Sequence, residues 1–168
     1  MAVDLTPRQP AKAYGGEGGA YYEWSPAELP MLGVASIGAA KLSLAAGGMS
    51  LPSYSDSAKV AYVLQALLNC LSVVGPDGKR VLETRIEGGS LFIVPRFHVV
   101  SKIADASGME WFSIITTPNP IFSHLAGKTS VWKAISPEVL EASFNTTPEM
   151  EKLFRSKRLD SEIFFAPN

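Results

Sequence analysis

Short apolar segments separated by turn residues fill the chain from about residue 36 to residue 117, and this spacing limits the folds open to it. The run 71–86 has Pro76-Asp77-Gly78 at its centre, and the run 98–117 has Asp105-Ala106-Ser107-Gly108. Each run predicts two strands joined as a β-hairpin, because these residues favour tight turns. Many short strands at this spacing predict a mainly β fold, either a sandwich or a barrel.

The last third of the chain changes character, because two copies of one helix-start signal appear there. Ser136-Pro137-Glu138 and Thr147-Pro148-Glu149 each place a hydroxyl residue at the N-cap, proline at the first helical position and an acid in the first turn. They predict two short amphipathic helices, with these apolar residues on one face of each: Val139, Leu140 and Phe144, then Met150, Leu153 and Phe154. Helices this short need the barrel or a second subunit to cover that face.

These patterns divide the chain into three parts. Residues 1–19 end in two glycine pairs and are expected to form an N-terminal arm that is ordered only by packing against a neighbour. Residues 20–135 are expected to form the barrel. Residues 136–168 are expected to form the helical hairpin and a tail.

Composition narrows the class of protein and its partners. The chain has 168 residues, of which 46% are hydrophobic and 18% charged, as in a globular domain. A net charge of −1 leaves no basic footprint for nucleic acid. No apolar stretch approaches the roughly 20 residues of a membrane span, so no membrane partner is expected. Residues 1–19 do not read as a signal peptide, and Cys70 is the single cysteine, so the sequence predicts a cytoplasmic location.

Two long segments carry a family resemblance. Residues 87–158 include "LFIVP", "WFSI" and "LAGKTSVWKAISPEVL", and residues 18–64 run from "GGAYYEW" to "KVAYVL". Together they resemble the plant cupins of the legumin-like (11S globulin) seed storage group: the later segment is similar to the end of a legumin cupin domain, and the earlier one to the start of a cupin domain in the non-storage cytosolic relatives of that group. The resemblance implies a cupin jelly-roll β-barrel with a C-terminal helical hairpin. It also implies a homo-oligomer formed through the hairpin, a trimer rather than a dimer, and a nutrient-reservoir role.

The resemblance also bears on metal binding. Catalytic cupins hold a metal with three histidines and a glutamate, ligands that suit Mn, Fe or Ni. In this chain Ser53 and Ser55 fall at the first two histidines, Val60 at the glutamate and Val100 at the third histidine. Hydroxyl and valine side chains cannot replace these ligands. The alignment therefore predicts no metal and no other cofactor.

Two functions remain open at this point. The first is a metal-free, non-catalytic and self-associating cupin of reservoir type. The alternative is a barrel that binds a small apolar ligand, or a metal-independent isomerase or cyclase, with Tyr62 and His98 in the pocket. Tyr62 and Leu64 share a strand face with Val60 and are predicted to point into the barrel, as core or as ligand site. His98 is a pocket acid or base in one interpretation and a hydrogen-bonded residue near a strand start in the other.

One junction in the chain raises a further hypothesis. Relatives have two barrels, and this chain reads as a single-barrel version whose halves meet between Gln65 and Cys70. Ala66-Leu67-Leu68-Asn69 has no glycine, so we expect a wider turn or a bulge at Leu67 to Asn69.

Overall fold

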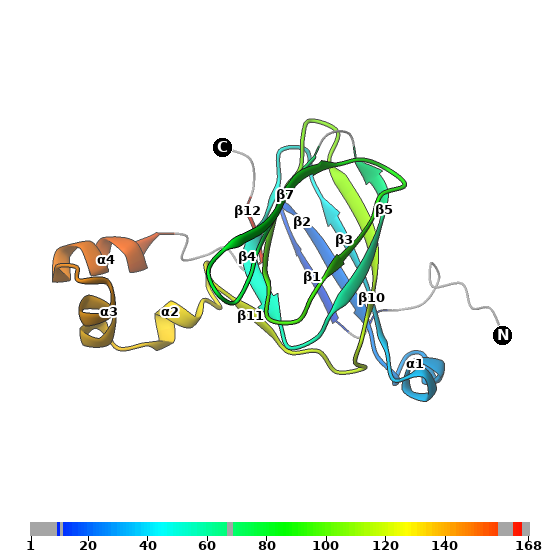
Figure 1. The fold of residues 1–168 in the computed structure, drawn as a ribbon, viewed down its shortest axis with the longest axis horizontal. Helices are drawn as coiled ribbons and strands as arrows, with labels where there is room; N and C mark the ends of the chain where they lie inside the picture. The colour runs from blue at the N-terminus through cyan, green and yellow to red at the C-terminus, as the bar shows by residue number, and fades with distance from the viewer. Residues whose placement is uncertain (1–9, 11, 67–68, 158–162, 166–168) are drawn as a thin grey trace.

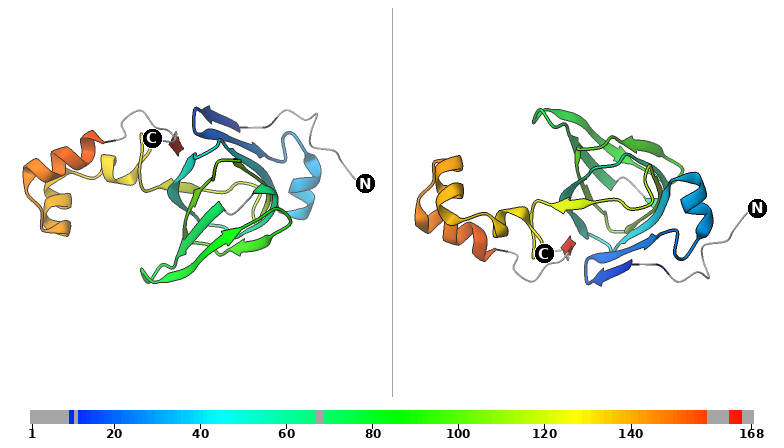
Figure 2. Two further views of the ribbon diagram at one scale, coloured as in Figure 1. Left: turned by 90° about the horizontal axis from the view of Figure 1, so that it is seen from above. Right: turned by 90° about the horizontal axis from the view of Figure 1, so that it is seen from below.

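The computed structural model describes residues 10, 12–66, 69–157 and 163–165. Within this part of the chain, two antiparallel sheets of six strands each face one another and enclose the core (Figure 1 and Figure 2). The first sheet has the order β1-β2-β3-β10-β5-β8, with bounds Lys12–Gly16, Gly19–Trp24, Gly38–Leu44, Met109–Ile115, Lys59–Ala66 and Leu91–Val94. The second has the order β11-β4-β9-β6-β7, with bounds Phe122–His124, Met49–Ser55, Val99–Ile103, Asn69–Val74 and Arg80–Ile86, and β12 (Phe164–Phe165) pairs with β4. The predicted mainly β fold is confirmed.

The N-terminal part differs from the expected arm. β1 pairs along its whole length with β2, so residues 12–19 belong to the first sheet. The expected boundary at residue 19 is therefore wrong for this stretch. Residues 1–9 and 11 lie outside the described residues. The two glycine pairs flank the turn of this hairpin, where Gly19 has a positive φ of 153°.

The two predicted hairpins have different outcomes. β6 and β7 pair as an antiparallel hairpin around Gly78, whose φ of 77° requires glycine there. β9 and β10 do not pair with each other, because β9 lies between β4 and β6 and β10 lies between β3 and β5. The segment around Gly108 therefore crosses from one sheet to the other, and the prediction of a second hairpin is wrong. Turn residues indicate that the chain changes direction, but they do not determine which strand the following segment pairs with.

The barrel core selects one face of each strand. On β5, Ala61 and Val63 point inward, and Val63 is 0% exposed. Tyr62 is 48% exposed and Leu64 is also exposed, on the opposite face. The prediction that these two residues point into the barrel is therefore wrong. The run from Val60 to Leu64 is apolar at every position, so alternation could not tell its two faces apart.

Four helices lie outside the sheets in the described part of the chain. α1 (Pro30–Ala35) packs its Leu32 against Trp24 and Ala39 on the outside of the first sheet. α2 (Val131–Ala134), α3 (Pro137–Phe144) and α4 (Pro148–Ser156) extend away from the barrel on one side, as Figure 1 and Figure 2 show. α3 and α4 begin at the two predicted N-cap residues and prolines. In the described residues, no helix is long and apolar enough to cross a lipid bilayer.

The junction between β5 and β6 is described only at its ends. β5 ends at Ala66 and β6 begins at Asn69, in different sheets, and the Ala66 carbonyl accepts a hydrogen bond from the Gly88 amide at 3.1 Å. Leu67 and Leu68 lie outside the described residues, so the expected wide turn stays a prediction.

Candidate functional site

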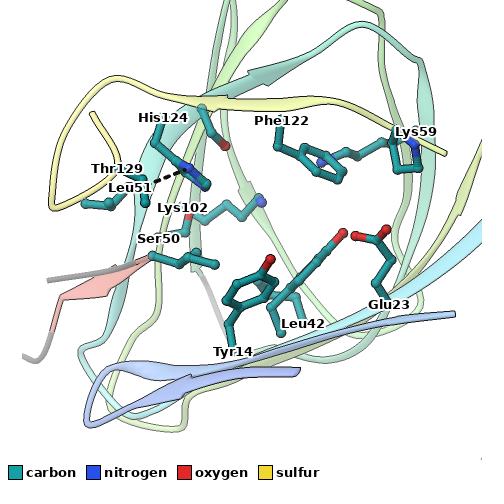
Figure 3. A pocket seen from close by; sticks show the side chains of 14 residues that line it. Tyr14, Glu23, Leu42, Ser50, Leu51, Lys59, Lys102, Phe122, His124 and Thr129 are labelled. Atoms are coloured by element: carbon teal, nitrogen blue, oxygen red, sulfur yellow. Dashed lines mark hydrogen bonds between the residues drawn. The ribbon is translucent and has the colours of Figure 1, made fainter. Parts of the chain in front are cut away.

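A pocket of about 360 Å³ opens into the barrel where β1 and β2 of the first sheet face β4 and β11 of the second. Figure 3 shows its lining side chains pointing toward one another from both sheets. It combines apolar, hydroxyl and charged groups: Tyr14, Tyr21, Glu23, Leu42, Ser50, Leu51, Ser53, Lys59, Lys102, Pro120, Phe122, His124, Thr129 and Ile163. Its volume falls in the usual range of small-ligand pockets, about 300–1,000 Å³.

A bulge in β4 shapes one wall. Ser50 lies opposite Lys102 and Ser53 lies opposite Val100, so three steps along β4 match two steps along β9. In a regular strand Ser50 and Ser53 would point to opposite faces. Pro52, which has no amide hydrogen to give to the sheet, lies inside this irregular stretch. The bulge brings both serines to the pocket.

Lys102 is a deeply buried basic residue in the pocket wall. It follows the buried Val100 on the inner face of β9 and is 6% exposed. Its Nζ lies 4.0 Å from the centre of the Trp111 ring, a cation–π contact. Burial, and then the like charge of Lys59, hold the pKa of the Lys102 ammonium well below its ordinary value.

Lys59 enters the pocket from β5. It shares the inner face with Ala61 and Val63, and its Nζ lies 4.1 Å from the centre of the Phe122 ring on β11. Burial lowers the pKa of Lys59 to about 8, and the carboxylate of Glu23 opposes that effect. At neutral pH this ammonium is therefore mostly charged.

Aromatic hydroxyls and a carboxylate line the side formed by β1 and β2. The rings of Tyr14 and Tyr21 lie 6.3 Å apart, and Tyr21 meets the Phe122 ring edge-on at 6.1 Å. Burial, and then the charge of the nearby Glu23, raise the pKa of the Tyr21 hydroxyl well above its usual value. Tyr21 therefore stays protonated, and its hydroxyl is available to a ligand as a hydrogen-bond donor.

His124 lies at the end of β11, with Nδ1 3.2 Å from the Thr129 hydroxyl. Burial, and then the charges of Lys59 and Lys102, lower its pKa below the usual 6.5. The imidazole is therefore neutral at pH 7 and adds no positive charge to the pocket.

The four aligned metal positions do not converge on one centre. Ser53 lines the pocket, and Val100 lies opposite it in the barrel core. Ser55 is buried at the end of β4, where its Oγ lies 3.4 Å from Asp56 Oδ1 and accepts a hydrogen bond from the Ser57 amide. Val60 is half-buried and belongs to the alternate residues of β5 that point out of the barrel, whereas its neighbour Lys59 faces the pocket.

A divalent metal does not fit the donors that are present. In the described residues, no group of three or more His, Cys, Asp or Glu side chains comes together. The pocket instead presents two lysine side chains, a single imidazole and the single carboxylate of Glu23, too few ligands for a metal ion and an unfavourable setting for a cation. The site chemistry therefore favours an anion over a metal ion.

The two residues chosen for a ligand pocket lie elsewhere. Tyr62 is on the outer face of β5, and neither it nor His98 is among the pocket residues. His98 lies in the turn between β8 and β9, where its Nδ1 is 3.0 Å from the Arg96 carbonyl oxygen. This arrangement matches the structural interpretation of His98, that of a hydrogen-bonded residue near a strand start.

The residues that sequence reasoning missed carried a readable signal. Lys59 lies on the same strand face as Ala61 and Val63, and Lys102 lies on the same face as Val100. Each lysine therefore occupies an inward position in its strand. A charged residue is rarely buried unless it is paired or used. Choosing the correct inner face of β5 would have identified Lys59. Tyr14 carried no comparable signal, because the sequence predicts an arm for residues 1–19, and no local pattern pairs that segment with the strand of Tyr21 and Glu23.

Comparisons with known proteins agree with this architecture. The family model described as "Cupin" matches residues 5–152 in one span. Glutelin type-A 3 of Oryza sativa subsp. japonica is 28% identical over 142 residues, which cover 84% of this chain and 28% of that protein. The 12S seed storage protein CRD of Arabidopsis thaliana is 27% identical over 140 residues, which cover 83% of this chain and 31% of that protein. This chain thus spans less than a third of these curated relatives.

A solved structure shows the same fold. The recombinant pro-11S globulin of pumpkin superposes with a TM-score of 0.89 at 24% sequence identity. The superposition covers 95% of this chain and 41% of that chain. Both sheets and the C-terminal helices therefore correspond to one cupin domain of a longer relative.

Proposed function

This chain belongs to the cupin family and corresponds to one cupin domain of the two-domain 11S globulin and glutelin seed storage proteins, and on that premise we propose that it is a non-catalytic cupin that self-associates and has a reservoir-type role. A trimer is the expected assembly. A cytoplasmic location is part of the same proposal, supported by the single cysteine.

The observation that carries this proposal is the apolar surface of the helical hairpin. α3 and α4 extend away from the barrel (Figure 2). Leu140 is the buried apolar residue of the two helices. Five large apolar side chains of these helices are exposed, and we call them the hairpin surface: Val139, Phe144, Met150, Leu153 and Phe154. Helices of eight and nine residues with such a surface need a partner to be stable.

A hollow beside this surface offers a place for a partner's side chain. It has a volume of about 260 Å³ and lies where α2 and α4 meet the loop after β11. Trp132, Phe154 and Phe165 give it an apolar lining, with Lys133 and Arg155 at its polar side. A second copy of the chain can fill it with an apolar residue from its own hairpin surface.

Size-exclusion chromatography with light scattering tests self-association. The full chain should elute as one species of about three times the monomer mass. Phe154→Asp should lower that mass or precipitate the chain, because it would bury a charge in the interface. Lys152→Ala on the same helix is the matched control and should leave the mass unchanged. A wild-type chain that stays monomeric would refute the proposal.

The metal-free part of the proposal has its own measurement. Elemental analysis of gently purified protein should give well under one equivalent of Mn, Fe, Ni or Zn per chain. One full equivalent of any of these, bound in the pocket, would contradict the donor chemistry described above.

A second candidate function is the binding of a small molecule inside the barrel, and the pocket favours it. The lining has apolar walls with a few converging polar groups, as ligand sites do. An isomerase or cyclase that uses Tyr62 and His98 is not supported, because neither residue lines the pocket. A binding role through Lys59, Lys102 and their neighbours takes its place.

A further inference from the structure

The pocket is lined by more basic than acidic side chains. The groups that face it and can carry charge come from five strands: Tyr14 on β1, Tyr21 and Glu23 on β2, Lys59 on β5, Lys102 on β9 and His124 on β11. Tyr21 stays protonated and His124 stays neutral. Among the described lining residues, two lysine amines therefore stand against the single carboxylate of Glu23, and a bound anion would favour the protonated form of both.

Glu23 faces the pocket on the same side as Lys59 (Figure 3). Its carboxylate raises the pKa of Lys59, whereas the charge that acts on Lys102 is the like charge of Lys59 itself. Figure 3 shows the same arrangement, with Glu23 on the Lys59 side of the pocket and Lys102 nearer Ser50. Burial of a charge is costly unless a counter-ion or hydrogen bonds compensate it. An anion from solution can provide the charge that Lys102 lacks.

Ser50 adds a hydrogen-bond donor at the same place. Its residue lies directly opposite Lys102 in the β4–β9 pairing, and its side chain is 4% exposed. Within the described residues, Ser50 Oγ has no hydrogen-bond partner. A buried hydroxyl without a hydrogen-bond partner destabilises the protein, and a bound ligand that accepts its hydrogen bond would remove that cost. Ser50 and Lys102 thus form a polar corner suited to an oxygen anion.

The rest of the wall is apolar. Leu42 and Leu51 face the pocket from β3 and β4, and Phe122 and Ile163 approach from the second-sheet side. These groups favour a ligand that carries hydrocarbon as well as charge. A fully hydrated inorganic anion would leave them against water.

We propose that this pocket binds a small organic monocarboxylate, with its carboxylate beside Lys102 and Ser50 and its apolar body against Leu42, Leu51 and Phe122. This assignment rests on the second function proposed above, small-molecule binding in the barrel. One negative charge balances the excess of one ammonium group over Glu23. The volume of about 360 Å³ suits a ligand the size of a single aromatic ring with a carboxylate.

Calorimetry on the full chain with three probes tests the assignment. Benzoate combines a ring with a carboxylate, benzamide has the same shape without charge, and inorganic phosphate has charge without a ring. Benzoate should bind with one site per chain and at least about ten-fold more tightly than either other probe, a difference of about 1.4 kcal/mol. Equal binding of benzoate and benzamide would overturn the anion assignment while leaving small-molecule binding intact. Phosphate binding as tightly as benzoate would overturn the organic part, and no binding of any probe would overturn both proposals.

Variants locate the site. Lys102→Met keeps the length and apolar stem of the side chain, and should weaken benzoate at least about ten-fold, because it removes the charged hydrogen-bond partner. Lys59→Met should weaken benzoate binding as well. Lys41→Met is the matched control, because Lys41 pairs with Glu110 at 2.8 Å on the outer face of the first sheet. Benzoate binding that is unchanged in both pocket variants, or lost equally in the control, would overturn the assignment.

Discussion

Ser50 and Lys102 lie directly opposite each other on neighbouring strands β4 and β9, and both side chains face the same pocket. The hydroxyl is a buried donor without a partner in the described residues, and the amine of Lys102 is buried near Lys59, so burial and the like charge both disfavour its charged form. This pair is unfavourable for the empty protein and favourable for a protein that holds an anion. The barrel therefore keeps groups that burial alone would disfavour.

Lys102→Met should stabilise the unliganded protein. Replacing a buried ion by an apolar residue of similar volume is often stabilising, by about 1–4 kcal/mol. Burial lowers the pKa of Lys102 in the folded chain. Between that lowered pKa and the ordinary 10.5, the Lys102 amine is protonated in the unfolded chain and neutral in the folded chain. The free energy of unfolding of the wild type should therefore rise with pH in this window. Urea denaturation at several pH values should show a smaller rise in Lys102→Met, and equal slopes would contradict the placement of this lysine.

Benzoate affinity should fall as pH rises. Binding of the anion favours the protonated forms of Lys102 and Lys59, and the pKa of Lys59 is about 8 in the unliganded protein. Benzoate itself stays ionised through this range, so the loss of affinity reports the lysines. Titrations between about pH 6 and about pH 9 should show progressive weakening together with proton uptake on binding. A flat profile would contradict the role of the lysines.

Truncation of two leucines tests which faces of the strands are buried. Leu71→Ala on β6 removes a side chain that is completely buried, and should cost about 2–5 kcal/mol of unfolding free energy. Leu64→Ala on β5 removes an exposed side chain, and should change stability by no more than about 0.5 kcal/mol. Chemical denaturation measures both. Equal losses would mean that Leu64 also lies in a packed environment.

Arg155→Met should loosen the helical hairpin. Arg155 on α4 pairs with the buried Glu151, and it donates hydrogen bonds to the carbonyls of Lys133, at 2.9 Å, and Ile135. Its loss leaves a buried carboxylate without its cation and should cost about 3–5 kcal/mol. Arg80→Met breaks an exposed pair with Glu83 and should cost no more than about 1 kcal/mol. Hydrogen exchange of the α4 amides measures the effect of both variants. Exchange should be faster in Arg155→Met and unchanged in Arg80→Met.

Local signals predicted the elements well where they depend on neighbours in the chain. Ser136 and Thr147 stand at the N-caps of α3 and α4, each followed by proline, as predicted. Pro76-Asp77-Gly78 makes the turn of the β6–β7 hairpin. The same reasoning failed around Gly108, because an identical kind of turn carries the chain from β9 in one sheet to β10 in the other. A turn sequence specifies local backbone angles and leaves strand pairing to distant contacts.

The sequence by itself determined the fold class, the starts of the two hairpin helices α3 and α4, and the absence of histidine or acid at the aligned metal positions. Only the tertiary structure decided which face of β5 is the inside, and therefore that Lys59 and not Val60 faces the pocket. It also decided that β1 joins the first sheet, and that a bulge in β4 turns both Ser50 and Ser53 inward. The physical reason is that side-chain orientation in a strand has a period of two, so a shift of one residue in the pairing register moves every side chain of the strand to the other face. Register is set by packing between strands far apart in the chain, which no local pattern of residues contains.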